Sequence, residues 1–105
     1  DHIDVDYCKK KGIIISNVPS YGENTVAEHT FSLILAISRK LYSSIRRTRE
    51  EHSFETDNTL KGFDLKDKTL GIIGMGRIGQ SVAKIAQSGF GMKIVYYDKF
   101  KKSIL

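Results

Sequence analysis

The stretch Thr69-Leu70-Gly71-Ile72-Ile73-Gly74-Met75-Gly76-Arg77-Ile78-Gly79 decides the fold of this chain. Its first five residues form an apolar run that predicts a buried strand of a parallel sheet. The following segment, Arg77–Ser88, has apolar residues at helical spacing and predicts a helix that Gly89 and Gly91 end. A second apolar run, Lys93–Tyr97, predicts another strand. The order strand, glycine-rich turn, helix, strand is that of a βαβ unit.

The glycine spacing Gly74-x-Gly76-x-x-Gly79 indicates a phosphate-binding turn. Gly74 allows the tight turn, Gly76 leaves room for a pyrophosphate, and Gly79 lets the helix pack close to the strand. The backbone amides near Arg77 and Ile78 lie at a helix N-terminus, where free donors and the helix dipole favour an anion. The alternative interpretation is that these glycines only shape a turn.

Asp98 follows the second strand, 19 residues after Gly79. At this position a carboxylate accepts hydrogen bonds from the ribose hydroxyls of a dinucleotide. It also repels a 2′-phosphate by about 1–4 kcal/mol, which predicts a preference for NAD over NADP. Three lysines after Asp98 would weaken this preference. They are Lys99, Lys101 and Lys102.

The N-terminal half alternates apolar and polar segments. Asp4–Lys11 predicts a short helix closed by Gly12, and Ile13–Ile15 predicts a buried strand. A long helix is expected from Thr25 to His52, begun by a capping box formed by Thr25 and Glu28. Its first half is apolar nearly all round, so we expect it to be buried on several sides. The polar segment after it, up to Asp67, is expected to be a linker.

Composition places the chain among ordinary globular proteins. It has 105 residues, enough for one domain, with 40% apolar and 28% charged residues. One cysteine, Cys8, forms no internal disulfide and no cysteine-based zinc site, so we predict a reducing, cytoplasmic location and no metal site. The longest apolar stretch is too short for a membrane span. The net charge of +5 comes from separate clusters without interleaved aromatic residues, which argues against nucleic-acid binding.

Several motifs together resemble one family, the D-isomer-specific 2-hydroxyacid dehydrogenases, which includes D-lactate, D-glycerate and phosphoglycerate dehydrogenases. The resemblance covers essentially the whole chain. Asp67 departs from the pattern, since a glycine often stands there in the family. The motifs are Asp1-His2-Ile3-Asp4, Asn17-Val18-Pro19-Ser20-Tyr21, Ala27-Glu28-His29, Gly62-Phe63-Asp64-Leu65, the segment from Lys68 to Gly79, Phe90-Gly91-Met92 and Tyr97-Asp98.

The resemblance implies an incomplete, Rossmann-like α/β fold. Residues 1–22 would end the first segment of a flavodoxin-like catalytic domain, and residues 23–54 would form an interdomain helix that also contacts a second subunit. Residues 55–68 would be a linker, and residues 69–105 would begin the NAD-binding domain with its first βαβ unit. The implied reaction is hydride transfer between NAD(H) and a 2-hydroxy or 2-oxo acid, in a homodimer.

The resemblance also assigns site residues. It implies a cofactor site at Gly74, Gly76, Arg77, Ile78, Gly79 and Asp98. It adds Val26 on the nicotinamide side, and Tyr21 facing the substrate as in some D-lactate dehydrogenases. The family's catalytic arginine, glutamate and histidine would lie after Leu105, so no catalytic residue is assigned.

Histidines in this chain do not replace the family's base, because His29 is expected on a buried helix and His52 at a solvated helix end. Two alternatives stay open. The chain is a non-catalytic NAD(H)-binding or interaction module of the same family, or a structural fragment that binds nothing. Its incomplete sheets predict marginal stability and a tendency to aggregate or dimerise.

Overall fold

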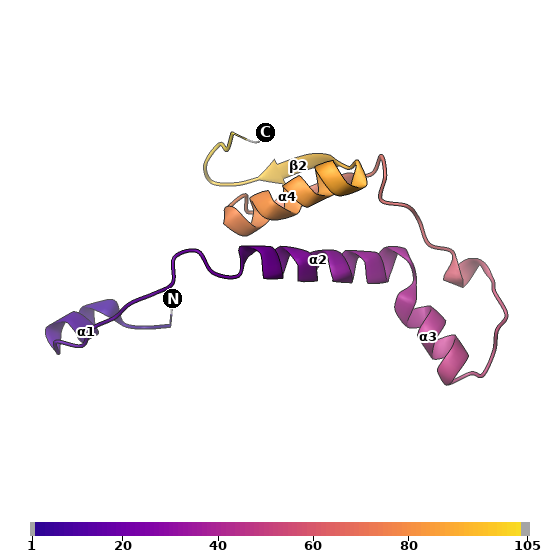
Figure 1. The fold of residues 1–105 in the computed structure, drawn as a ribbon, viewed down its shortest axis with the longest axis horizontal. Coiled ribbons are helices and arrows are strands. Elements are labelled where there is room, and N and C mark those ends of the chain that lie inside the picture. The colour runs from indigo at the N-terminus through magenta and orange to yellow at the C-terminus, as the bar shows by residue number, and fades with distance from the viewer. Residues whose placement is uncertain (1, 104–105) are drawn as a thin grey trace.

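The computed structural model describes residues 2–103 of the chain (Figure 1). The helices are α1 (Val5–Lys10), α2 (Glu23–Ser38), α3 (Leu41–Arg49), the short 3-10 helix η1 (Asn58–Leu60) and α4 (Arg77–Phe90). The strands are β1 (Thr69–Ile73) and β2 (Lys93–Tyr97). None of the helices within residues 2–103 is long and apolar enough to cross a membrane.

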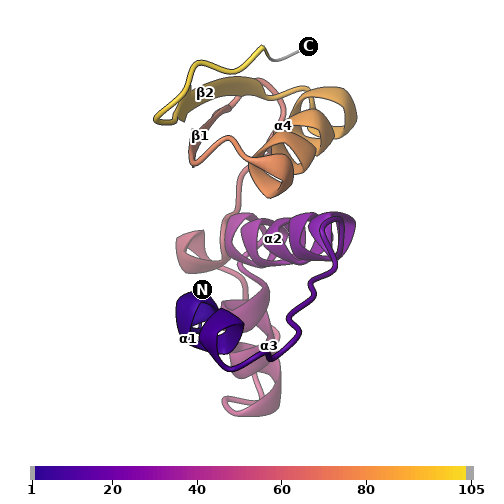
Figure 2. The same ribbon diagram turned by 90° about the vertical axis from the view of Figure 1, so that its left-hand side faces the viewer.

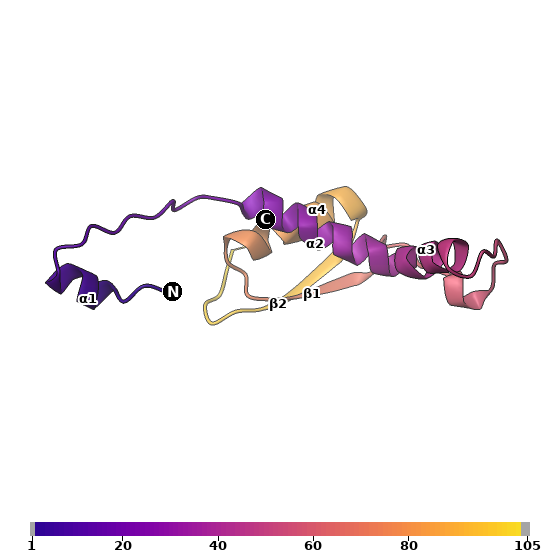
Figure 3. The ribbon, with the colours of Figure 1, turned by 90° about the horizontal axis from the view of Figure 1, so that it is seen from below.

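The βαβ unit of the sequence analysis is confirmed. Strands β1 and β2 pair in parallel, in a register that runs from Thr69 opposite Lys93 to Ile73 opposite Tyr97. Helix α4 connects them and packs on one face of the sheet, as Figures 2 and 3 show. The other face is open, because Ile73 is 90% exposed. The helix runs two residues beyond the predicted end: Gly89 lies inside it, and Gly91 alone ends it with a left-handed φ of 62°.

The apolar core lies between α2 and α4, which run side by side in Figures 1 and 3. The rings of Phe31 and Phe90 stack with centroids 5.0 Å apart and planes 6° from parallel. Leu65, from the segment before β1, is buried in the same core and fixes the predicted linker to it. The buried members of the core are Ala27, Phe31, Leu65, Val82, Ala86 and Met92.

The predicted single helix from Thr25 to His52 is wrong. The chain forms two helices, and Lys40 between them has a left-handed φ of 54°. The carbonyl of Ser38, which a continuing helix would use four residues later, accepts a hydrogen bond from the Phe63 amide at 2.9 Å. The linker therefore ends α2.

The predicted capping box is also wrong. Helix α2 begins at Glu23, two residues before the predicted cap Thr25, and its N-cap residue Gly22 has a left-handed conformation, φ 79°. Among the residues that the structure describes, no side chain caps this end of the helix. Thr25 lies in the first turn instead of before it.

The predicted strand Ile13–Ile15 is absent, and Ile14 is 95% exposed. A strand is stable only when its backbone groups pair with a neighbour, and within residues 2–103 no strand lies beside this segment. The preceding helix is confirmed as α1, with Asp4 as its N-cap. Gly12 ends it with a φ of 68°, and the Ile13 amide donates to the Cys8 carbonyl at 2.9 Å in a Schellman arrangement.

Helix α2 is buried on one side only, contrary to the expectation from its sequence. Ala27 and Phe31 face α4, whereas Leu33 and Ile37 are 54% and 68% exposed, and His29 is exposed too. The chain is correspondingly extended. Its radius of gyration is 20.0 Å, against about 13 Å for a compact domain of this length. Figures 1 and 3 show α1 well apart from the core formed by α2, α4 and the two strands.

Candidate functional site

The turn after β1 is fixed by backbone hydrogen bonds to the end of β2. Gly74 has a φ of +94°, and its amide donates to the Tyr97 carbonyl at 2.8 Å. Met75 is fully buried, and its amide donates to an Asp98 carboxylate oxygen at 2.6 Å. The Met75 carbonyl accepts from the Gln80 side-chain amide at 3.0 Å. The turn is thus held in one conformation by residues from both neighbouring elements.

Each glycine of the motif has its own structural reason. Gly74 adopts a left-handed backbone that favours glycine. A Cβ atom on Gly79 would lie 2.2 Å from the Gly74 carbonyl oxygen, so only glycine lets α4 approach the turn. A Cβ atom on Gly76 would meet no atom of residues 2–103 within 4 Å, so these residues leave the space over Gly76 open. Open space at the middle glycine is what a pyrophosphate requires.

The first turn of α4 presents free backbone donors. Gly76 is the N-cap residue, and the helix begins at Arg77. Within residues 2–103, the amides of Gly76, Arg77 and Ile78 have no hydrogen-bond acceptor. Such orphan amides, together with the positive end of the helix dipole, bind anions and especially phosphates. The arrangement therefore fits the diphosphate of a nucleotide.

Asp98 lies beside these donors. One of its carboxylate oxygens accepts from the Met75 amide, and the other accepts from the Phe100 amide at 3.0 Å. The hydrogen bonds from Phe100 and Met75, together with the positive charge of Lys102, hold the pKa of Asp98 below its ordinary value against a smaller effect of desolvation. Asp98 is consequently ionised at neutral pH and keeps lone pairs for further donors, such as ribose hydroxyls.

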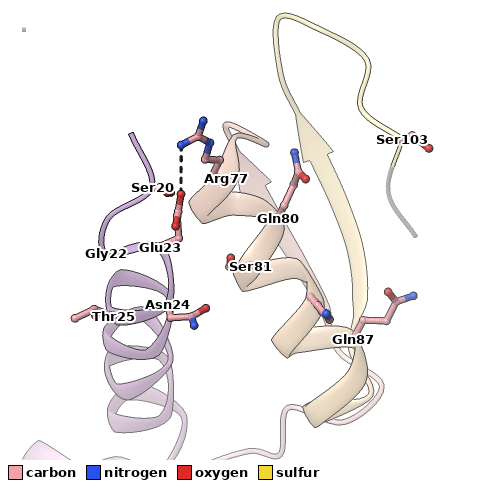
Figure 4. A pocket seen from close by; sticks show the side chains of 11 residues that line it. Ser20, Gly22, Glu23, Asn24, Thr25, Arg77, Gln80, Ser81, Gln87 and Ser103 are labelled. Carbon is pink, nitrogen blue, oxygen red and sulfur yellow. Dashed lines mark ion pairs between the residues drawn. The ribbon is translucent and has the colours of Figure 1, made fainter. Parts of the chain in front are cut away.

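A polar cleft of about 570 Å³ separates the N-terminal ends of α2 and α4 (Figure 4). The Arg77 guanidinium reaches across it. Its Nη1 atom lies 3.5 Å from the Glu23 carboxylate and donates to the Pro19 carbonyl. The lining residues are Ser20, Gly22, Glu23, Asn24, Thr25, Arg77, Gln80, Ser81, Lys84, Gln87 and Ser103.

Most of the expected cofactor residues come together at one edge of the sheet, the end of β1 and β2 next to the start of α4. They are Gly74, Gly76, Arg77, Ile78, Gly79 and Asp98. Tyr21 and Val26 are separate from this group. Tyr21 is 84% exposed and Val26 is 45% exposed. Neither residue lines the cleft, although residues next to them in the sequence do, such as Gly22 and Thr25.

Sequence reasoning missed several residues that fix the turn and span the cleft. Met75 and Gln80 fix the turn, and Glu23 pairs with Arg77. Gln80 follows the motif by one residue, and its nearness was the only available signal. The Arg77 contact to Pro19 joins residues 58 positions apart, and no local pattern indicates such a contact.

A strand that leads into a glycine turn, a helix with free N-terminal amides and a second strand that ends in an aspartate define a dinucleotide-binding unit. Comparison with models of protein families identifies which family of dinucleotide-binding proteins this is. Residues 31–104 match the model "D-isomer specific 2-hydroxyacid dehydrogenase, NAD binding domain", and the chain belongs to this family.

Individual relatives agree with the family assignment. The chain is 41% identical to a D-lactate dehydrogenase of Staphylococcus aureus over 100 residues, 95% of this chain and 30% of that protein. It resembles the crystal structure of the TT0316 protein from Thermus thermophilus with a TM-score of 0.89 and 35% identity, over 99% of this chain and 33% of that one.

A second solved structure is D-lactate dehydrogenase from Aquifex aeolicus complexed with NAD and lactic acid. It matches with a TM-score of 0.81 and 44% identity, over 97% of this chain and 30% of that one. The chain therefore spans about 30% of the length of the relatives it matches.

Proposed function

We propose that this chain is part of an NAD-dependent oxidoreductase that transfers a hydride between NAD(H) and the CH–OH carbon of a D-2-hydroxy acid. Residues 1–22 would end the first segment of its catalytic domain, and residues 23–54 would join the two domains. Residues 55–68 would be the linker, and residues 69–105 would begin the NAD-binding domain. The single cysteine, Cys8, suits a cytoplasmic enzyme.

The observation that carries the proposal is the row of free amides at Gly76, Arg77 and Ile78 beside the ionised Asp98. In the proposed complex the amides bind the pyrophosphate, and Asp98 accepts from the adenosine ribose. Gly74 and Gly79 keep the turn in the shape that exposes these donors. When bound, NAD would supply the hydride acceptor at its nicotinamide ring.

Substitution of Gly76 tests the cofactor site directly. We expect Gly76→Val to weaken NADH binding by about tenfold or more, because the new side chain enters the space that the pyrophosphate needs. Folding should be unaffected, since that space is open and the φ of Gly76 is −74°. NADH fluorescence titration of the full native polypeptide measures the affinity, and a thermal melt checks the fold.

The matched control is Gly89→Val, which places the same side chain in open space at the other end of α4. It should bind NADH like the unsubstituted protein. Equal NADH affinity of the Gly76→Val and Gly89→Val variants would contradict a pyrophosphate at this turn.

A second candidate is a non-catalytic NAD(H)-binding or interaction module. The free amides of Gly76, Arg77 and Ile78 beside Asp98 support it equally, because they account for dinucleotide binding and not for hydride transfer. Oxidation of NADH by the full native polypeptide with a panel of 2-oxo acids separates the candidates. Turnover supports the dehydrogenase, with Tyr21 and Val26 as candidate contacts for substrate and nicotinamide. NADH binding without turnover supports the module.

We also propose that the protein is a homodimer whose subunits meet through α2 and α3. Leu33 and Ile37, one helical turn apart on α2, are exposed, and so are Leu41 and Ile45 on α3. Pairs with this spacing lie on one face of a helix. Apolar faces of this kind mark protein–protein contacts more often than free surface.

A further inference from the structure

The segment after Asp98 folds back on β2 and forms a compact basic turn. The Tyr96 hydroxyl accepts a hydrogen bond from the Lys102 amide at 3.1 Å and donates one to the Lys102 carbonyl at 2.9 Å. The Lys102 ammonium lies over the Phe100 ring, 5.8 Å from its centroid, and the Phe100 amide donates to Asp98. The Lys102 backbone is thus fixed to the Tyr96 side chain and Lys102 is partly buried, while Lys99 and Lys101 are exposed.

The turn formed by residues 98–102 has a net positive charge, although the Asp98 carboxylate in it is negative. Residues 98–102 contain one carboxylate and three lysines, Lys99, Lys101 and Lys102. The Lys102 ammonium lies over the ring of Phe100, whose amide binds Asp98, and its charge adds a smaller contribution to the lowered pKa of Asp98. Asp98 is also occupied by two backbone amides. A phosphate arriving here would meet a carboxylate whose oxygens already accept from two amides and a lysine whose backbone is held by Tyr96.

We propose that Lys102, anchored by Tyr96, is a specificity-determining residue that admits a 2′-phosphorylated dinucleotide, so that this site binds NADPH as well as NADH. The inference rests on the proposed function, because it needs the adenosine ribose to lie at Asp98. A cation offsets the repulsion between Asp98 and a 2′-phosphate. It has no comparable effect on NADH, which carries no charge at that position.

The test compares the dissociation constants of NADPH and NADH for the full native polypeptide at low ionic strength, by fluorescence titration. We expect the two constants to lie within about tenfold of each other. Lys102→Met keeps the aliphatic stem and removes the charge. It should therefore weaken NADPH binding about tenfold and leave NADH binding nearly unchanged. Tyr96→Phe, which releases the anchor, should act in the same direction with a smaller effect.

The matched control is Lys93→Met, which removes a lysine from the opposite end of β2 and should change neither constant. Added salt should weaken NADPH more steeply than NADH. This comparison of the two coenzymes needs no variant, so it also tests the proposal if a substitution impairs folding.

Three results would overturn the proposal. NADH binding with NADPH at least about 100-fold weaker would show that Asp98 dominates, and the proposed function would stand. If Lys102→Met weakened the binding of NADPH and NADH equally, Lys102 would support only the structure of the turn. Absence of binding for both coenzymes would overturn the proposed function itself, and this inference with it.

Discussion

At the scale of single residues, the three glycines of the turn show that one motif serves three physical purposes. Gly74 is required for its backbone angle, Gly79 for its contact with the Gly74 carbonyl, and Gly76 for the open space above it. Only the last purpose concerns a ligand directly. Substitutions at the three positions should therefore separate folding from binding.

Gly79→Ala should destabilise the fold, because its Cβ atom would lie 2.2 Å from a backbone oxygen that cannot move without distorting the turn. We expect a loss of about 1–3 kcal/mol, the usual range for overpacking. Gly89→Ala in the same helix meets open space and should stabilise by about 0.5–1 kcal/mol. Thermal or urea unfolding measures both, and equal effects of the two variants would contradict this account of Gly79.

The residues of the turn could be predicted because their reasons are local. Glycine spacing and the aspartate after the second strand are visible within a short stretch of sequence, and the geometry of that turn follows from them. The Glu23–Arg77 ion pair and the Ser38–Phe63 hydrogen bond could not be predicted. Both join segments far apart in the sequence, and their residue types are common on any polar surface.

At the scale of elements, the prediction is right where the elements that pack together are also neighbours in the sequence. Strands β1 and β2 are paired through the helix between them, and all three were predicted. Ile13–Ile15 has the composition of a strand but no neighbouring strand within residues 2–103, and it stays irregular. The periodicity of Thr25–His52 is helical throughout, yet Phe63 takes the carbonyl that would continue α2. The lack of a partner strand therefore overrides the local pattern at Ile13–Ile15, and a tertiary hydrogen bond overrides it at the end of α2.

The loop after α3 depends on one arginine and one carboxylate. Arg47 is largely buried, lies 3.0 Å from Asp57, and donates to the Glu55 carbonyl and the Thr59 hydroxyl. The Thr59 hydroxyl and amide both donate to Asp57. These Thr59 hydrogen bonds, and then Arg47, lower the pKa of Asp57 from its ordinary value of 3.8.

This loop should loosen in acid. Because the pKa of Asp57 is lower in the folded state, its ionised form stabilises the loop above pH 3.8, and the contribution is lost as the pH falls through the folded-state pKa. The Thr59 amide resonance should titrate with a midpoint below 3.8 in NMR spectra. Asp57→Asn should remove that titration. A midpoint at or above the ordinary value would contradict the predicted stabilisation.

At the scale of the whole molecule, the chain exposes much more surface than a compact protein of its mass. Its accessible area is 8938 Å², whereas a folded monomer of 11.8 kDa exposes about 5,900 Å². Part of the excess is the open sheet face at Ile73 and Val95, and part is the apolar residues of α2 and α3. The relatives are about three times longer than the region that this chain matches.

In the proposed homodimer, the exposed apolar residues of α2 form part of the contact between the subunits. Ile37 is 68% exposed on the side of α2 away from Phe31 and the core. If a second subunit covers it, Ile37→Glu buries a charge at the contact and should weaken self-association by about tenfold or more. Sedimentation velocity of the full native polypeptide over a range of concentrations measures the effect.

Gln87→Glu on α4 is the matched control, because it adds the same charge at an exposed position away from the apolar residues of α2 and α3. It should sediment like the unsubstituted protein, as a dimer. The apolar α2 residues explain that dimer only if the unsubstituted protein self-associates and Ile37→Glu, but not Gln87→Glu, reverses it. A protein that stays monomeric at high concentration would instead leave Leu33 and Ile37 to be covered by residues outside this chain.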